Sequence, residues 1–517
     1  EKIIVTNKPY FYVTTPIYYV NDKPHIGHAY TSLACDVLAR FQRWLGNDVL
    51  FLTGTDEHGQ KVQQSAEKRG VSPQAFTDDV SDSFRRLAQD MGYSNDDFIR
   101  TTEPRHYRAA QALWQRIASK GDIYLGTYSG WYCVRDEAFY QADELVEGSH
   151  GQKLAPTGAA VEWVEEESYF FKLSAYEQRL IDFYESQPDC VLPKSRRNEV
   201  MSFVKGGLKD LSCSRTTFDW GIPVPGDENH VMYVWFDALS NYLTAAGYPD
   251  REPGSADSFW PASLHVVGKD ILRFHAVYWP AFLMAAGLPL PKRIFAHGWW
   301  TNEGQKISKS VGNVIDPYDL VADYGLDQTR YFLLREVPFG NDGDFSRTAM
   351  VQRMNSDLSN AYGNLAQRSL SMVHKNCDAQ IPEPGKFLDV DRELLAAVAG
   401  LKTSVTDRLD VQAFHSALET VWGIIGQANV YIDAQAPWTL KNEDPDRMKT
   451  VLYVVLEAVR RITMVLQPFM PSSCGQLLDL LGVDKDIRSA VHWDVALQPA
   501  TVIPKPTGIF PRYTENN

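Results

Sequence analysis

Two hydrophobic periodicities alternate over the start of the chain. Residues Tyr10 to Val20 are rich in Tyr, Val, Thr and Ile, which is typical of a strand. His28 to Leu45 carry apolar residues at helical spacing and end at Gly46. A second apolar run, Val49 to Thr53, follows and ends in polar residues. Strand, helix and strand in this order predict a βαβ unit.

Units of this kind build a parallel sheet with helices on both faces, and ligands bind outside the carboxyl ends of its strands. Several polar residues fall at that edge of the predicted sheet, namely His25, His28, Asp56, Glu57 and His58. The sequence therefore predicts an α/β core with a ligand site at this edge.

The pattern changes twice further along. Between about 115 and 225, aromatic residues lie among acidic and Gly-rich turns, which predicts a mixed β insertion, and the α/β pattern resumes at "VMYVWFDALSNYL" and "SLHVVGKDILRFH". After Met350 strand signals nearly vanish, and amphipathic helices are expected over residues 350–376, 390–409, 411–434, 446–467 and 471–482. They predict a helix bundle. The last stretch, "TVIPKPTGIFPRYTENN", is predicted to be an extended tail on the surface.

Composition bounds the class of protein. A chain of 517 residues is too long for one core, so we expect two to four domains. Hydrophobic residues make up 44% and charged residues 22%, which excludes a disordered chain. The six cysteines are scattered without a CxxC pair, so neither a disulfide framework nor a thiolate zinc site is indicated, and a reducing cytoplasm fits best.

The net charge of the chain limits the kinds of molecule that it is expected to bind. A net charge of −14 argues against indiscriminate nucleic-acid binding, although it leaves room for a local site. The longest apolar helix candidate, "TVLYVVLEAVRRITMVLQPF", is interrupted by Glu457, Arg460 and Arg461, which a membrane span would rarely carry, and no signal-peptide pattern opens the chain. We therefore expect a soluble protein that does not enter membranes.

Two basic motifs suggest phosphate chemistry. A helix start presents unpaired N–H groups and favours a phosphate, and His25 and His28 would add side-chain donors there. Gly27 lacks a Cβ, so a flat ring or a phosphate could approach the backbone. In "NEGQKISKSVGNV", Lys306 and Lys309 lie in a Gly- and Ser-rich loop whose ammonium groups could close on a polyphosphate. Each motif alone would more often be ordinary solvated polar residues.

Together, His-Ile-Gly-His and Lys-Ile-Ser-Lys-Ser resemble the two signatures of class I aminoacyl-tRNA synthetases. The blocks "TTPIYYVND", "GTDEHG", "YVWFDALSNY", "GKDILRFH" and "NVYIDAQAPW" extend the resemblance, over essentially the whole chain, to the methionyl-tRNA synthetase family. It implies a Rossmann-type parallel-sheet catalytic core (1–115 and 226–295) split by a connective insertion (116–225). A stem-contact region with the lysine loop (296–350), an α-helical anticodon-binding domain (351–500) and a C-terminal tail (501–517) would follow.

The resemblance also implies the reaction. Methionine and ATP would form methionyl-adenylate and pyrophosphate, and the 3′-terminal ribose of tRNA(Met), initiator tRNA included, would then take the acyl group. Such chemistry relies on positioning and charge stabilisation, with Mg²⁺ neutralising phosphates. By motif match His25 and His28 would bind ATP and stabilise the transition state, Gly27 would lie near the adenosine, and Lys306 and Lys309 would hold the triphosphate.

Methionine selection follows from the same match. Asp56 would anchor the α-ammonium group, although a helix N-cap is an equally plausible role for it without the family. The side-chain pocket would be lined by Ile17, Tyr19, Trp235, Ala238, Leu239, Tyr242 and His275. An aromatic stripe at helical spacing is more often core than pocket, and only the resemblance favours the pocket. Leu239 departs from the Pro that some family members carry.

Two further expectations come from comparing the chain with the family. Many relatives bind structural zinc through Cys-x-x-Cys pairs, whereas Cys133 here has no such pair; Cys133, Asp136 and His150 could be assembled on paper, but we expect no metal. Asn364 and Arg368, which lie at i and i+4, together with Trp438, match the family's anticodon readers.

The sequence thus favours a cytoplasmic methionine–tRNA ligase. Its partners would be L-methionine, ATP and tRNA(Met), and we expect a monomer because no dimerisation module follows the bundle. Two alternatives stay open: a class I synthetase for leucine, isoleucine, valine or cysteine, and a tRNA-binding regulator that keeps the fold without the enzyme's chemistry.

Overall fold

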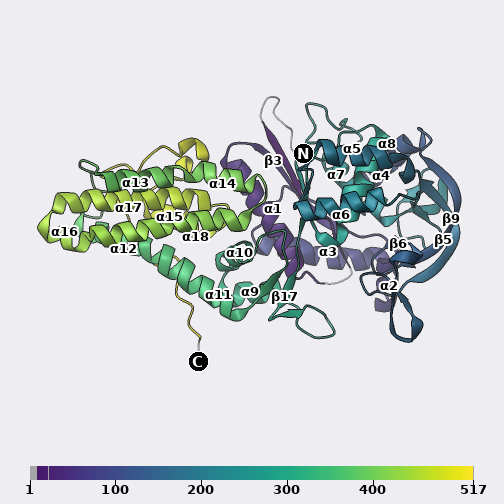
Figure 1. The fold of residues 1–517 in the computed structure, drawn as a ribbon, viewed down its shortest axis with the longest axis horizontal. Helices are drawn as coiled ribbons and strands as arrows, with labels where there is room; N and C mark the ends of the chain where they lie inside the picture. The colour runs from purple at the N-terminus through teal and green to yellow at the C-terminus, as the bar shows by residue number, and fades with distance from the viewer. Residues whose placement is uncertain (1–8, 21–22, 516–517) are drawn as a thin grey trace. The chain divides into compact units, whose positions relative to one another are not determined.

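The computed structural model describes residues 9–20 and 23–515, which form two compact units (Figure 1). The first unit holds residues 9–20, 23–24 and 48–297. The second holds residues 25–47 and 298–515, so the helix that follows the first strands belongs with the C-terminal half of the chain.

A parallel sheet forms the centre of the first unit. Its strands run in the order β10-β16-β15-β1-β3-β2, and β4 also pairs with β3. The bounds are β1 Tyr10–Thr14, β2 Tyr18–Tyr19, β3 Asp48–Asp56, β4 Asp97–Arg100, β10 Val191–Leu192, β15 Leu264–Gly268 and β16 Ile294–His297. The predicted α/β core with a parallel sheet is confirmed.

Helices and small antiparallel sheets complete the first unit. The helices are α2 Gln60–Arg69, α3 Pro73–Asp90, α4 Pro104–Ala118, α5 Glu177–Ser186, α6 Lys194–Lys205, α7 Val234–Ala245 and α8 Trp279–Ala286. One antiparallel sheet runs β11-β9-β5-β6 and another β12-β14-β13. The bounds are β5 Ile123–Cys133, β6 Ala138–Tyr140, β7 Val146–Glu147, β8 Lys153–Leu154, β9 Glu162–Phe171, β11 Leu211–Ser212, β12 Ser214–Arg215, β13 Pro223–Val224 and β14 Asp227–Met232.

Three strand predictions need correction. The single strand expected over Tyr10–Val20 is two strands, because the chain leaves the ladder around Pro16, which has no N–H to donate. Strand β3 runs on to Asp56 instead of ending at Thr53, and the N-cap of α2 is Gly59, so Asp56 is a strand residue and not a helix cap. Strand β14, in the stretch assigned to the core, pairs antiparallel in a small sheet.

The second unit joins a small sheet to a helical array. Its elements before the bundle are α1 Ile26–Trp44, β17 Trp300–Asn302, β18 Gln305–Lys306, α9 Pro317–Tyr324, α10 Leu326–Arg335 and β19 Gly343–Phe345. The bundle consists of α11 Arg347–Gln352, a π-helical segment Arg353–Gly363, α12 Asn364–Asn376, α13 Asp389–Ala399, α14 Leu401–Leu409, α15 Phe414–Gln435, α16 Pro437–Glu443, α17 Pro445–Leu466 and α18 Pro471–Leu480.

Helix α17 is the axis of the bundle, with α12, α13, α15 and α18 packed beside it (Figure 1). The charges that interrupt its apolar sequence are paired inside the protein: Arg460 Nε donates to Glu457 at 2.9 Å, and Arg460 also bonds the Trp493 carbonyl. No helix in the described part of the chain is long and apolar enough to cross a membrane.

Two further details concern helix α16 and the end of the chain. Helix α15 ends at Gln435 and Pro437 begins α16, where its missing N–H costs nothing, so Trp438 lies in the first turn of α16, directly after a helix end. The C-terminal stretch is extended, but it is packed as well as surface-lying, because Ile503 and Phe510 are buried and the Phe510 ring lies 5.6 Å from that of Tyr362.

Candidate active site

Six buried polar side-chain atoms in the described part of the first unit lack partners, and three of them belong to residues that lie near one another. These three are Asp56 Oδ1, at the end of β3, the hydroxyl of Tyr19, on β2, and Trp235 Nε1, on α7; none meets a hydrogen-bond partner among the described residues. Tyr19 and Asp56 are register neighbours on adjacent strands, and the Tyr19 ring lies edge-on to Trp235 at 6.2 Å. Buried polar atoms of a folded protein are normally paired, so this cluster is suited to a polar ligand.

The electrostatics around Asp56 favour a cationic ligand. Burial, and after it the charges of Asp237, Glu137 and Glu57, raises the pKa of Asp56 well above its usual value. Glu57 is neutralised by Arg100, whose guanidinium donates to both of its carboxylate oxygens. A positive group placed against Asp56 would relieve this repulsion and return the carboxyl to its ionised form.

A cluster of apolar side chains, here called the apolar wall, begins at Trp235, whose ring contacts that of Tyr19. Helix α7 contributes four buried side chains, Trp235, Ala238, Leu239 and Tyr242, and Ile17 is also buried. The Trp235 ring is stacked on Phe274 with centroids 4.0 Å apart and planes 7° apart. The wall thus consists of buried aliphatic and aromatic side chains.

His275 closes this wall without adding charge. Its Nε2 lies 2.7 Å from the Tyr242 hydroxyl and its Nδ1 lies 3.0 Å from the Ile271 carbonyl, so Nδ1–H donates and Nε2 accepts. Burial lowers the pKa of His275 to about 4. The neutral ring therefore suits an uncharged ligand side chain.

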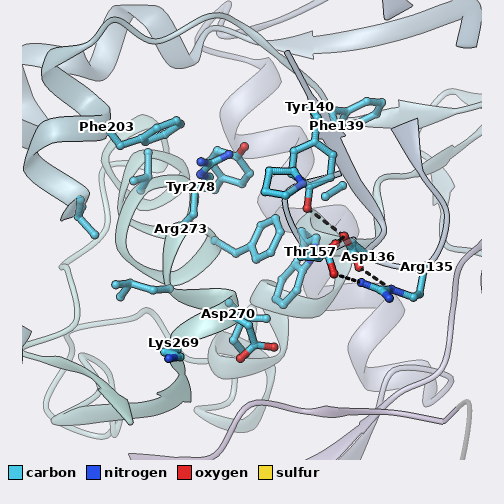
Figure 2. Close-up of a pocket in the computed structure, with 18 of the residues that line it drawn as sticks. Arg135, Asp136, Phe139, Tyr140, Thr157, Phe203, Lys269, Asp270, Arg273 and Tyr278 are labelled. Atoms are coloured by element: carbon cyan, nitrogen blue, oxygen red, sulfur yellow. Dashed lines mark hydrogen bonds and ion pairs between the residues drawn. The ribbon is translucent and has the colours of Figure 1, made fainter. Parts of the chain in front are cut away.

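A pocket of about 500 Å³ opens next to the wall (Figure 2). Tyr19, Trp235 and Phe274 line it, together with polar residues that include Lys269 and Asp270. On one side of the pocket, Asp136 accepts hydrogen bonds from Tyr140 and Thr157 and is paired with Arg135. The volume is of the size that holds a small molecule in proteins.

In the second unit, the start of α1 caps itself. His25 is the N-cap: its Nδ1 accepts from Gly27 N at 3.0 Å, and His25 N donates to His28 Nδ1 at 3.0 Å. The N–H groups of His28 and Ala29 bond the His25 carbonyl. The prediction that this helix start offers unpaired N–H groups is therefore wrong, because its own side chains and carbonyl use them.

This capping fixes the tautomer of both rings. Since each Nδ1 accepts a backbone hydrogen bond, Nε2 is the nitrogen that carries the proton in each ring. Burial, and then the neighbouring His25, lowers the pKa of His28 well below its usual value. The His28 ring is therefore neutral, with its proton on Nε2. Glycine is favoured at position 27 because a Cβ there would come within 2.8 Å of the His25 ring.

The lysine loop extends from a hairpin in the same unit. Lys306 ends β18, which pairs antiparallel with β17, and both Lys306 and Lys309 are exposed. Asn313 shapes the loop: its side chain accepts from Ser308 N at 2.9 Å and donates to the Lys306 carbonyl at 3.0 Å. The ammonium groups of Lys306 and Lys309 thus belong to a short loop that is held together by its own hydrogen bonds.

The loop and the histidine pair are joined at their bases. Ile26 N, the first N–H of α1, donates to the Ile315 carbonyl just after the loop at 3.2 Å. Farther along α1, buried Asp36 pairs with Arg330 at 2.8 Å, and the Tyr30 ring contacts Trp300 of the hairpin. The structure thus brings the two basic motifs, some 280 residues apart in sequence, onto one framework.

The bundle carries the three anticodon candidates on two helices, α12 and α16. Asn364 and Arg368 lie one turn apart on α12, and the guanidinium carbon of Arg368 lies 5.9 Å from the centre of the Trp438 ring. Arg368 also bonds Asn429 and pairs with Asp433. Trp438 remains 42% exposed, which leaves ring surface for a stacking base.

Several residues of these sites were not predicted. Phe274 stacks on Trp235, and Asn429 and Asp433 hold Arg368. Phe274 lies within "GKDILRFH" and the other two within "NVYIDAQAPW", so the blocks contained them, but nothing in single-sequence spacing separates them from core residues.

The three residues considered for zinc do not form a tetrahedral metal site. In residues 9–20 and 23–515, ligand atoms of at least three His, Cys, Asp or Glu residues come together at a single place, which consists of Glu167, Asp227 and His230. The ligand atoms of Cys133, Asp136 and His150 therefore do not converge. Burial raises the pKa of the Cys133 thiol to about 11, which disfavours the thiolate that zinc needs. The absence of structural zinc stays a prediction.

Comparison with known proteins places these features in a family. The family model described as "tRNA synthetases class I (M)" matches residues 11–370, and that described as "Anticodon binding domain of methionyl tRNA ligase" matches residues 381–516. The methionine–tRNA ligase of Mesorhizobium japonicum is 58% identical over 98% of both chains. That of Rickettsia bellii is 56% identical over 98% of this chain and 99% of the relative.

Comparison with solved structures points to the same family. Methionyl-tRNA synthetase of Mycobacterium tuberculosis in complex with methionyl-adenylate superposes with a TM-score of 0.95 at 53% identity, covering 98% of this chain and all of the other. Its apo form gives a TM-score of 0.90 at 50% identity over 99% of both chains. The chain therefore belongs to the methionyl-tRNA synthetases, the class I family of methionine–tRNA ligases.

Proposed function

We propose that this methionine–tRNA ligase uses Asp56 to bind the ammonium group of L-methionine, activates the amino acid with ATP to methionyl-adenylate, and transfers it to the 3′-terminal ribose of tRNA(Met), initiator tRNA included. The observation that carries the proposal is the buried, unpartnered Asp56 Oδ1 beside an uncharged aromatic and aliphatic wall. An amino acid with a neutral, apolar side chain satisfies both features.

Methionine fits this wall on chemical grounds. Its ammonium group would make a charge-assisted hydrogen bond to Asp56, and the hydroxyl of Tyr19 is an adjacent unpartnered group. The thioether would lie among Ile17, Trp235, Ala238, Leu239, Tyr242 and His275, with sulfur against aromatic rings. A pocket of this kind distinguishes a methylene by only about 1–3 kcal/mol, so near-miss amino acids are discriminated weakly.

The basic motifs of the second unit supply the ATP site. His25 and His28 would donate through Nε2–H to the phosphates and stabilise the charge that develops at the α-phosphate. Lys306 and Lys309 would hold the triphosphate, and Gly27 would lie near the adenosine. Mg²⁺ would arrive on the phosphates of ATP and neutralise them. No covalent enzyme intermediate is required, because the methionine carboxylate is itself the nucleophile.

The test is methionine-dependent exchange of labelled pyrophosphate into ATP by purified protein supplied with Mg²⁺. Exchange should appear with methionine and be much weaker with leucine, isoleucine, valine or cysteine. Folded protein that exchanges equally well with one of these amino acids, or that exchanges with none, would refute the proposal.

Trp438→Ala should separate the two halves of the reaction. Pyrophosphate exchange should be unchanged, while kcat/KM for charging tRNA(Met) falls by about 10–100-fold, because base–aromatic stacking contributes about 1–3 kcal/mol per base. Asn364 and Arg368 are the proposed partners of Trp438 in reading the anticodon. Val491→Ala, which truncates an 83% exposed side chain in the same unit, is the control. Equal loss of exchange and charging in the Trp438 variant would contradict this division.

The remaining proposals concern the state of the protein. We propose a cytoplasmic monomer without structural zinc, with domains bounded at 1–115, 116–225, 226–295, 296–350, 351–500 and 501–517. Six buried free cysteines agree with a reducing compartment. Light scattering and elemental analysis of the purified protein test the oligomeric state and the metal content.

A further inference from the structure

A second buried carboxyl lies behind the proposed methionine site. Asp237 is on α7, between Trp235 and Ala238 of the apolar wall, and it is fully enclosed. Its two oxygens are held by two imidazoles: His58 Nδ1 lies 2.6 Å from Oδ2, and His106 Nε2 lies 2.6 Å from Oδ1. Both imidazoles are buried as well.

The two imidazoles come from different elements. His58 follows β3, two residues after Asp56, and His106 lies on α4, which packs against α7. His58 Nε2 lies 3.0 Å from the Tyr107 hydroxyl, also on α4, and His106 Nδ1 lies 2.9 Å from the Thr244 hydroxyl on α7. Asp237 is therefore the point at which the end of β3, helix α4 and helix α7 are tied together.

The hydrogen-bond roles follow from the charge of Asp237. Burial alone would raise the pKa of Asp237, but His58 and His106 lower it on balance, so the carboxylate is ionised and accepts from both rings. His58 then donates through Nδ1–H and accepts from the Tyr107 hydroxyl at Nε2. The pKa of Tyr107 is raised to about 12, first by burial and then by Asp237, which keeps that hydroxyl a donor.

We propose that Asp237, clamped between His58 and His106, is a positioning residue for methionine binding: it fixes the Asp56 carboxyl and the apolar wall of α7 relative to each other and adds its negative charge to the ammonium site. This inference rests on the proposed function, since it assumes that Asp56 receives the ammonium group. It assigns a role to three buried residues that lie outside the proposed binding residues.

The charge of Asp237 makes this role measurable. After burial, Asp237 is the strongest of the neighbours that raise the pKa of Asp56, ahead of Glu137 and Glu57. The other ionisable group facing Asp56 is Tyr19, while His58, His106 and Tyr107 face Asp237. Removing the charge of Asp237 should therefore lower the pKa of Asp56, whereas a simple loss of packing would not.

The test is Asp237→Asn, measured by pyrophosphate exchange across pH. KM for methionine at neutral pH should rise by about tenfold or more, because small displacements of a binding group are costly, while KM for ATP stays the same. The midpoint of the low-pH rise in KM for methionine should move to lower pH. Asp250→Asn, which breaks an exposed ion pair with Arg108, is the matched control and should change neither quantity.

A second pair of variants, at His106, tests the hydrogen bond to Asp237 in case Asp237→Asn does not fold. His106→Gln keeps a donor near the position of Nε2 and should retain most methionine affinity, whereas His106→Ala should raise KM for methionine as Asp237→Asn does. The inference is overturned if the two His106 variants behave alike, or if Asp237→Asn leaves both KM and the midpoint unchanged while Asp56→Asn raises KM. Absence of methionine-dependent exchange from the unmodified protein would instead refute the proposed function.

Discussion

Lys309→Ala is expected to slow methionine-dependent pyrophosphate exchange by about 10²–10³-fold in kcat, the range found when one preorganised donor to a transition-state charge is removed. Lys309 is exposed in a loop whose base is bonded to the start of α1 through Ile26 and Ile315, so its ammonium group is carried on the framework that holds His25 and His28. KM for methionine should hardly change, because the residues proposed to bind methionine belong to the other unit.

The controls separate lost charge from a disturbed loop. Lys309→Arg keeps a cation and should recover part of the rate, and Lys485→Ala removes an exposed lysine elsewhere in the same unit without effect on exchange. A Lys309→Ala protein that exchanges at the normal rate, or that loses methionine affinity in proportion to its rate, would show that this lysine does not stabilise the transition state.

The elements that sequence predicted correctly are those with strong periodicity. Helix α1 was expected from His28 to Leu45 and spans Ile26–Trp44, and the long helices α15 and α17 lie within a few residues of their predicted ranges. Their apolar faces are set by local spacing. Strand ends depend instead on partners far along the chain, so β3 continued to Asp56 only because β2 and β4 were there to pair with it.

The residues of the candidate site also fall into some that the sequence could predict and some that it could not. Motifs indicated His25, His28, Lys309 and Asp56, because those residue types in that order match a known chemistry. Spacing could not reveal that the two histidines cap their own helix, nor that Asp237 meets imidazoles 179 and 131 residues away. Both arrangements depend on side-chain directions that exist only after the sheet and helices have packed.

Asp56→Asn is expected to raise KM for methionine by about 10²–10³-fold, since leaving one charge of a buried, hydrogen-bonded pair without its partner costs about 2–5 kcal/mol. The amide keeps the size and one acceptor of the carboxyl but removes its charge. KM for ATP should stay close to that of the unmodified protein. Asp48→Asn, at the opposite end of the same strand, is the matched control. Normal methionine affinity in the Asp56 variant would remove this carboxyl from the site.

The pH dependence of KM for methionine is a second test of the role of Asp56. The pKa of Asp56 is raised well above its usual value, chiefly by burial, and only the ionised carboxyl attracts an ammonium group. Below that pKa, binding must first release a proton, so KM for methionine should rise about tenfold for each pH unit of acidification and level off above it. In Asp56→Asn this slope should vanish, because the group that titrates is gone. A slope that persists in the variant would assign the titration to another group and leave the ammonium anchor unidentified.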